Sequence, residues 1–244
     1  MINELDAEVV NFYEAVARQD PEMITAIQQV ANLFSKGLAS GGRDEQAAAY
    51  YAQRDLDRGG GLAGLSSGLR AARFFVVNQL AFSGMRRFNA DGEFNIPFGH
   101  YKSFNNQVIT SPRHVALLKN TTITCSSYEQ ALAASDNPRT FIFLDPPYTR
   151  VMKTYSAGST FGEDHQRLLA AHLKAMQHAS WMVVIDKSEL TLELYADHIV
   201  ATYPVNYGVN IKNRFSQAAE HIVATNYVTA SGVTPPFLKD GGRQ

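Results

Sequence analysis

The sequence predicts an α/β protein, and three observations favour that class. The C-terminal half alternates short apolar runs with helical patterns, as a sheet wound with helices does. The N-terminal half carries apolar residues at helical spacing. The chain has 244 residues, of which 45% are hydrophobic and 18% charged, enough to bury a sizeable core. This composition excludes a disordered tail, which needs low hydrophobicity and high net charge.

The N-terminal half is predicted to be mainly helical. Helices are expected over residues 7–17, from Pro21 to about residue 38, over 45–58 and over 69–82. A glycine-rich stretch, RGGGLAGLSSG at 58–68, separates the last two. It could be a phosphate cradle or a flexible loop, and the lack of a preceding strand favours a flexible loop.

A β-hairpin is predicted over residues 87–99, after these helices. Asp91-Gly92 suits a tight turn, and Phe88, Phe94 and Ile96 supply strand-forming side chains.

The C-terminal half supplies the sheet. Strands are expected over 121–125, 140–145, 181–186, 198–203 and 221–228, and helices over 163–178 and 189–197. In the first helix, Leu168, Leu169, Leu173 and Met176 are expected to form the apolar face. The tail from Ser231 onward is expected to be loose.

The charge distribution is uneven along the chain. Residues 54–119 hold nine Lys and Arg against four Asp and Glu, a local balance of +5 in a chain whose net charge is −1. This segment could be a localised phosphate-binding face, or the asymmetry could be chance on a solvated surface.

Composition also bears on location and metal chemistry. No apolar run is long enough for a membrane span, and the acidic N-terminus does not resemble a secretory signal. The single cysteine, Cys125, cannot form an internal disulfide, so a reducing cytoplasm is expected, in a bacterial or phage-infected cell. The seven histidines lack ligand spacing, and no metal is predicted.

The most informative motif is Asp145-Pro146-Pro147-Tyr148, directly after the apolar run FIFL. In open α/β sheets, ligands bind at the carboxyl ends of strands. Two prolines cannot continue a strand and they fix φ at two consecutive positions. Asp145 and the Pro146 carbonyl could each accept one N–H from an exocyclic amine, while Tyr148 stacks on the ring. The alternative is a proline-rich turn in which Tyr148 serves only packing.

This motif resembles the catalytic motif of amino-methyltransferases, and its surroundings resemble the Dam-like, D12-class family of DNA adenine-N6 methyltransferases. Residues 82–89 and 92–99 resemble the family's target-recognition hairpin. Residues 3–6 and 11–13 resemble the acidic strand end and helix that hold the ribose of S-adenosylmethionine (AdoMet), and residues 126–128 stand where the family has its adenine pocket. The similarity covers most of residues 3–228.

The resemblance implies methyl transfer from AdoMet to N6 of a flipped adenine in duplex DNA, without a metal. Asp145, Pro146, Pro147 and Tyr148 would be catalytic. The cofactor would contact Glu4, Ser127, Tyr128 and Asp145; the alternative for Glu4 is a solvated terminal charge. The residues expected at DNA are Phe82, Ser83, Met85, Arg86, Arg87, Pro97, His100, Lys102 and Arg113. Phe82 would wedge into the base stack, or else it is a core helix residue.

The resemblance also implies a fold and its division into domains. The expected fold is a Rossmann-like methyltransferase sheet with a helical and hairpin insertion. Residues 1–32 and 121–230 would form the catalytic domain, residues 33–120 the target-recognition domain, and residues 231–244 a loose tail.

The chain departs from the family pattern at its N-terminus. It lacks the FxGxG turn of the AdoMet-binding motif I, and the sheet is therefore expected to be N-terminally incomplete. A second polypeptide or a second copy could complete the AdoMet site. Alternatively, the protein is a catalytically inactive DNA-binding remnant that occupies methylation sites. Cytosine N4, RNA or a protein amide are further possible acceptors, and a role in restriction-modification or phage protection stays open.

Overall fold

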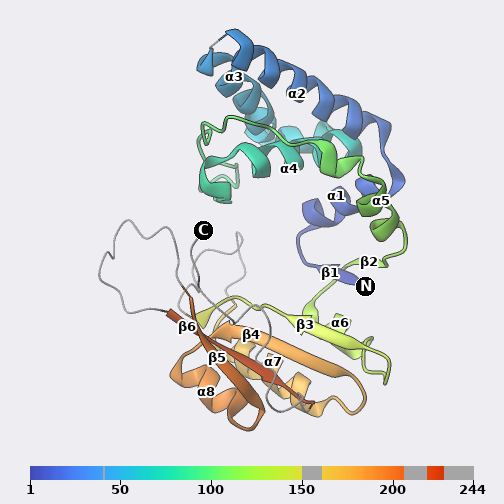
Figure 1. Ribbon diagram of the computed structural model, residues 1–244, viewed down its shortest axis with the longest axis vertical. Helices are drawn as coiled ribbons and strands as arrows, with labels where there is room; N and C mark the ends of the chain where they lie inside the picture. Colours follow the sequence, from blue (N-terminus) through green and yellow to red (C-terminus); the bar gives the residue numbers. More distant parts are fainter. Residues whose placement is uncertain (41, 150–160, 206–218, 228–244) are drawn as a thin grey trace. The chain divides into compact units, whose positions relative to one another are not determined.

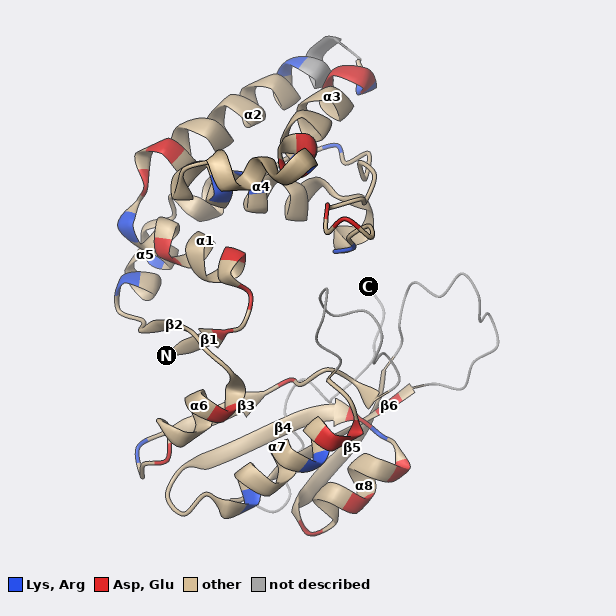
Figure 2. Cartoon of the chain, turned by 180° about the vertical axis from the view of Figure 1, so that it is seen from behind, with Lys and Arg blue, Asp and Glu red and all other residues tan. Residues whose placement is uncertain are grey.

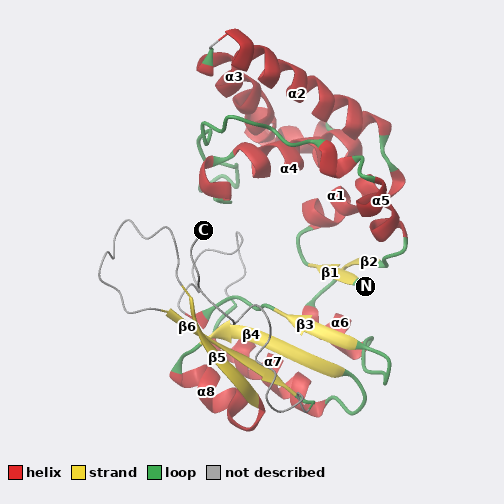
Figure 3. Ribbon diagram, viewed as in Figure 1, coloured by secondary structure: helices red, strands yellow, loops and turns green. Residues whose placement is uncertain are grey.

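The computed structural model describes residues 1–40, 42–149, 161–205 and 219–227 (Figure 1). The chain divides into two compact units, residues 1–128 and 129–244. The first unit is mainly helical, whereas the second contains a sheet with helices beside it (Figure 3). No helix among the described residues is long and apolar enough to cross a membrane.

Five α-helices build most of unit 1; four lie close to the predicted positions, and α5 was not predicted. They are α1 (Ala7–Arg18), α2 (Pro21–Ser40), α3 (Arg43–Arg54), α4 (Ser67–Leu80) and α5 (Pro112–Lys119). Capping residues fix two of the starts: the side chain of Asp6 accepts from the Glu8 amide, and that of Ser66 accepts from the Leu69 amide. Short 3-10 segments η1 (Asp55–Gly64), η2 (Phe82–Gly84) and η3 (Gln107–Ile109) connect them.

One hydrophobic core runs through unit 1. It joins the helices to the hairpin segment, and its fully buried members include Ile27, Phe34, Tyr50, Leu80, Phe94, Ile96 and Phe98. Helices from the predicted catalytic and recognition segments therefore pack against the same side chains.

Two short parallel strands complete unit 1. Strand β1 (Ile2–Glu4) pairs with β2 (Ile123–Cys125), with Glu4 opposite Cys125. Asn3 links the two strand ends, because its Oδ1 accepts from the hydroxyls of Thr124 and Ser126 and its Nδ2 donates to the Ser126 carbonyl. The link holds the residues that follow β1 beside those that follow β2.

Unit 2 contains a four-stranded mixed sheet in the order β3-β4-β6-β5. Its strands are β3 (Phe141–Leu144), β4 (Ser180–Asp186), β5 (Ile199–Val205) and β6 (Ala219–Thr225). Strands β3 and β4 are parallel, and β6 runs antiparallel to both of its neighbours, β4 and β5. Helix α6 (Tyr128–Ala133) precedes β3, helix α7 (Glu163–Ala175) lies between β3 and β4, and α8 (Glu189–Tyr195) with η5 (Ala196–His198) lies between β4 and β5.

The alternation of buried side chains in β4 shows which face of the sheet is covered. Trp181, Val183 and Ile185 are fully buried, and the Trp181 indole donates to the Leu173 carbonyl of α7 at 2.9 Å. Helices α7 and α8 contact each other on this side (Figure 1).

The predicted apolar face of α7 was wrong at two positions, because Leu168 lies outside the inward stripe and Met176 follows the last helical residue, Ala175. Leu168 is 45% exposed, whereas Gln166 is fully buried beside Leu169 and Leu173. Residues 166, 169, 170 and 173 follow helical spacing and define the inward stripe, and residue 168 falls outside it. The buried amide at 166 has a specific partner in the site described below.

Candidate functional site

The acidic turn, residues 145–149, begins at the carboxyl end of β3. Asp145 is exposed, and no described residue donates a hydrogen bond to its carboxylate. An aspartate side chain in a turn commonly accepts from the amide two residues further on, but neither Pro146 nor Pro147 has an amide N–H. The two prolines therefore leave the Asp145 carboxylate available to a ligand.

The side chains of Asp186 and Gln166 hold the acidic turn in place by hydrogen bonds. Asp186, at the end of β4 and 5% exposed, accepts from the Thr149 amide at 2.8 Å and from the Thr149 hydroxyl at 2.5 Å. Gln166 of α7 donates to the Pro147 carbonyl at 2.7 Å. The turn is thus fixed by hydrogen bonds to two neighbouring elements, as a rigid binding edge requires.

An aromatic cluster lies behind Tyr148. The Tyr148 ring meets the His221 ring edge-on at 4.8 Å between centroids, and the Tyr203 ring also meets His221 edge-on, at 5.6 Å. The strand pairing places Asp186, His221 and Tyr203 in one row across β4, β6 and β5. Tyr148 therefore presents its ring from a supported position.

The charge of Asp145 affects the pKa values of Tyr203 and His221 in this cluster. Burial raises the pKa of Tyr203, and the charge of Asp145 raises it further. Burial lowers the pKa of His221, although the charges of Asp186 and Asp145 oppose that effect. His221 is therefore neutral at neutral pH.

The predicted cofactor residues of unit 1 lie at neighbouring strand ends. Glu4 ends β1, while Ser127 and Tyr128 follow β2 by two and three residues. One carboxylate oxygen of Glu4 accepts from the amides of Leu5 at 2.9 Å and Asp6 at 3.4 Å. No described residue donates to its other oxygen, so Glu4 keeps acceptor capacity at this edge.

The predicted hairpin is present, held by two isolated antiparallel bridges instead of continuous strands. Ala81 pairs with Phe98 and Phe88 with Phe94. Gly92 has a φ of +78°, which the tight turn requires. Phe94, Ile96 and Phe98 are buried, whereas all the residues expected at DNA are exposed: Phe82, Ser83, Met85, Arg86, Arg87, Pro97, His100, Lys102 and Arg113.

Phe82 is not a core helix residue. Helix α4 ends at Leu80, and the Phe82 side chain is 42% exposed. Ser83 next to it has a φ of +54°, so the chain turns sharply here. Phe82 therefore presents an exposed aromatic ring on a turn.

The two arginines of the hairpin have different surroundings. Arg86 forms an ion pair with Asp6 at 2.7 Å and lies over the Phe74 and Phe88 rings. Arg87 donates through Nε to Asn95 at 2.9 Å, and no described residue accepts from its two terminal nitrogens. Of the two, Arg87 is therefore the one whose terminal nitrogens have no described acceptor.

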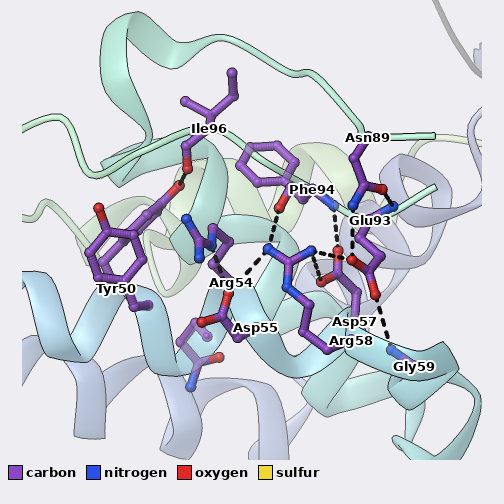
Figure 4. A network of polar contacts seen from close by, with 12 residues as sticks. Tyr50, Arg54, Asp55, Asp57, Arg58, Gly59, Asn89, Glu93, Phe94 and Ile96 are labelled. Carbon is purple, nitrogen blue, oxygen red and sulfur yellow. Dashed lines mark hydrogen bonds and ion pairs between the residues drawn. The ribbon is translucent and has the colours of Figure 1, made fainter. Parts of the chain in front are cut away.

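The glycine-rich segment corrects the prediction of a flexible loop. It forms η1, with left-handed φ values at Gly59 and Gly60, and the Gly59 amide donates to the Glu93 carboxylate at 3.1 Å (Figure 4). The prediction failed because the partner lies 34 residues away, beyond any local pattern. The segment therefore binds an anionic group, but that group is the Glu93 carboxylate of the hairpin in the same chain.

Ion pairs use much of the basic charge between residues 54 and 119. Arg54, Arg58, Arg70, Arg73 and Arg86 each pair with a carboxylate. Acidic and basic segments accordingly occur together on this unit (Figure 2). Among the described residues between 54 and 119, the Lys and Arg without an ion pair are Arg87, Lys102, Arg113 and Lys119.

The described residues contain no group of three or more His, Cys, Asp or Glu side chains that could hold a metal ion. Cys125 is a free, exposed thiol.

An acidic, proline-stiffened strand end beside an aromatic ring offers a ligand a carboxylate and a ring. Comparison with known families shows which family the chain belongs to. Residues 1–211 match the D12 class N6 adenine-specific DNA methyltransferases, and the chain belongs to this family. Its members are DNA methyltransferases, which generally use AdoMet.

Individual relatives agree with the family assignment. The chain is 32% identical over 160 residues to the type II methyltransferase M.CviBI of Paramecium bursaria Chlorella virus NC1A, covering 64% of this chain and 61% of that protein. It is 24% identical over 236 residues to the type II methyltransferase M1.LlaDCHI of Lactococcus lactis subsp. cremoris, covering 93% and 79%. It is 21% identical over 230 residues to the retron Ec67 DNA adenine methylase of Escherichia coli, covering 93% and 75%.

Sequence reasoning missed the residues that support the site: Asn3, Gln166, Asp186, Tyr203 and His221. Of these residues, Asp186 could have been found from the sequence pattern. Asp186 ends the apolar run WMVVI just as Asp145 ends FIFL, and both strands are parallel. The remaining four required knowledge of which elements pack together.

Proposed function

We propose that this protein transfers a methyl group from AdoMet to N6 of an adenine in duplex DNA. The observation that carries the proposal is the Asp145 carboxylate, exposed at a strand end and without a donor among the described residues, three residues before a supported tyrosine ring. Family membership supports the same conclusion.

The acidic turn suits an amino group on a planar ring. The Asp145 carboxylate and the Pro146 carbonyl each accept one N–H of the amine, which orients the nitrogen lone pair away from both oxygens. Positive charge that develops on the nitrogen is stabilised by the carboxylate. The residues thus contribute orientation and charge, the main requirements of an in-line displacement.

A base inside a duplex cannot reach such an edge, so the adenine must be flipped out. Flipping costs a few kcal/mol, and stacking on Tyr148 returns about 1–3 kcal/mol. Phe82 would fill the space that the flipped base leaves in the stack.

AdoMet supplies the methyl group, and the described residues fit its nucleoside half. Glu4 would accept from the ribose hydroxyls through the oxygen that has no described donor, and Ser127 and Tyr128 would line the adenine pocket. For the methionine half, the sequence contains no FxGxG turn after a strand.

We further propose that a second polypeptide, or a second copy of this chain, completes the sheet. Among the described residues, strand β3 pairs with β4 alone, and its residues Phe141 and Phe143 are 55% and 60% exposed. An open edge with two exposed phenylalanines is a template for another strand.

The test is methyl transfer by the purified protein from labelled AdoMet to a mixed-sequence duplex, followed by digestion and chromatography of the product. N6-methyladenine is expected with the wild type, and loss of label is expected with Asp145→Ala. Background label from both proteins, with any partner polypeptide present, would overturn the proposal. Labelled cytosine, RNA or protein would instead redefine the acceptor.

The rival function is a DNA-binding protein without catalysis. Calorimetry with a duplex and with AdoMet separates the two, because the rival predicts duplex binding and no AdoMet binding.

A further inference from the structure

The hairpin carries a carboxylate that is bound from several directions. Glu93 accepts from Arg58 Nη1 at 2.8 Å, from the Gly59 amide at 3.1 Å and from Asn89 Nδ2 at 3.0 Å (Figure 4). We call Glu93, Arg58, Gly59 and Asn89 the Glu93 cluster. The bonds from Asn89, Gly59 and Arg58 hold the pKa of Glu93 below its ordinary value.

The residue after Glu93 is fixed as well, by a buried ion pair. The Phe94 amide donates to Asp57 at 2.7 Å, and the Phe94 carbonyl accepts from Arg58 at 3.1 Å. Asp57, 7% exposed, also binds Arg73 at 2.6 Å. Tyr50 continues the series with a bond to the Ile96 carbonyl at 2.8 Å, so one strand of the hairpin is anchored along its length.

The anchored strand determines the position of Arg87. The Asn95 amide donates to the Arg87 carbonyl at 3.0 Å, and Arg87 Nε donates to the Asn95 side chain at 2.9 Å. Asn95 directly follows Glu93 and Phe94. Any rotation of the hairpin at Glu93 would therefore change where the Arg87 guanidinium points.

The Glu93 cluster is better explained by geometry than by stability. Arg58 and Glu93 are both partly exposed, with side-chain exposures of 34% and 20%, and such pairs contribute little to the free energy of unfolding. Three donors from two segments nevertheless define the direction of one carboxylate closely. A bidentate contact to a base edge needs that accuracy, because both hydrogen bonds must form together.

We infer that Glu93 is a positioning residue for sequence discrimination: through the Glu93 cluster it fixes the hairpin so that Arg87 meets one base pair of the target. This inference rests on the proposed function. It assigns to the glycine-rich segment the task of orienting the hairpin.

The experiment measures discrimination with the full chain. The target is first identified by mapping methylated adenines in DNA treated with the wild type. Equilibrium binding to that duplex and to duplexes with single base-pair changes is then compared for the wild type, Glu93→Gln and Asp91→Asn. Asp91→Asn is the matched control, because it removes the same charge two residues away from a side chain without a described partner.

Glu93→Gln is expected to lower discrimination at one base pair about tenfold, the scale of one lost base contact. The melting temperature and AdoMet binding should stay near the wild-type values, and Asp91→Asn should discriminate as the wild type does. Arg87→Ala should lower discrimination at the same base pair. The double variant with Glu93→Gln should show little further loss of discrimination.

Three results would overturn the inference: unchanged discrimination in Glu93→Gln, an equal loss of affinity for every duplex, or the same change in Asp91→Asn. The proposed function is tested separately by the wild type. If the wild type neither binds nor methylates duplex DNA, the function and the inference both fail. If it does both while Glu93→Gln discriminates normally, only the inference fails.

Discussion

Asp145 and Asp186 end neighbouring parallel strands, yet the structure uses them differently. Asp186 is 5% exposed and binds both the amide and the hydroxyl of Thr149. Asp145 is exposed and accepts no hydrogen bond from a described residue. The same residue type at the same kind of position is thus structural in one strand and available to a ligand in the other.

The available donors explain the difference. Asp145 precedes two prolines, which have no amide N–H to donate. Asp186 accepts both of its hydrogen bonds from Thr149, 37 positions away in the sequence. The prolines of the acidic turn therefore do more than stiffen it. They also remove the backbone N–H groups that would otherwise donate to the Asp145 carboxylate.

The largest effect is expected from Asp145→Ala. Because no described residue depends on this carboxylate, the melting temperature should stay close to that of the wild type. Methyl transfer should fall by about 10²–10³-fold, the usual loss when one charge-stabilising group is removed. The measurement is the single-turnover rate of label transfer beside a thermal melt, and a large drop in melting temperature would show that Asp145 is structural after all.

Asp186→Ala is expected to act on stability first. The substitution leaves the Thr149 amide and hydroxyl without their acceptor, which should lower the free energy of unfolding by about 1–3 kcal/mol. Urea unfolding provides the measurement. Thr149→Val is the matched partner for a double-mutant cycle, and additive effects of the two changes would mean that their contact contributes nothing.

Pro147→Ala tests the role of the missing amide. The new N–H stands two residues after Asp145, where an aspartate can accept it in a turn. Methyl transfer should fall by roughly tenfold because the acceptor is partly consumed, an effect near 1.4 kcal/mol, with little change in melting temperature. Pro138→Ala, at an exposed loop position, is the control. A Pro147→Ala enzyme with the wild-type rate would contradict this explanation of the two prolines.

The sequence was sufficient where a feature is local and insufficient where its cause is distant. The acidic turn, the hairpin and most helices and strands follow from adjacent residues and from periodicity. Asp136 shows the limit, since its carboxylate binds the amides of residues 177–179, more than forty positions away. The Glu93 cluster and the Gln166 bond to Pro147 are of the same kind, because only the packing of separate segments brings their partners together.

The smallest effect concerns pH and separates the aromatic support from the acidic turn. Because burial lowers the pKa of His221 below 6.5, the unfolded chain binds a proton there more readily than the folded one. The free energy of unfolding should therefore be fully retained above about pH 6.5 and decrease as the pH falls below it. His221→Gln removes this contribution, so its melting temperature should fall less between pH 7.5 and pH 5.5 than that of the wild type, by about a degree or two. Parallel curves for the wild type and His221→Gln would mean that the ring behind Tyr148 accepts a proton without cost, and that its neighbours Asp145 and Asp186 compensate fully for burial.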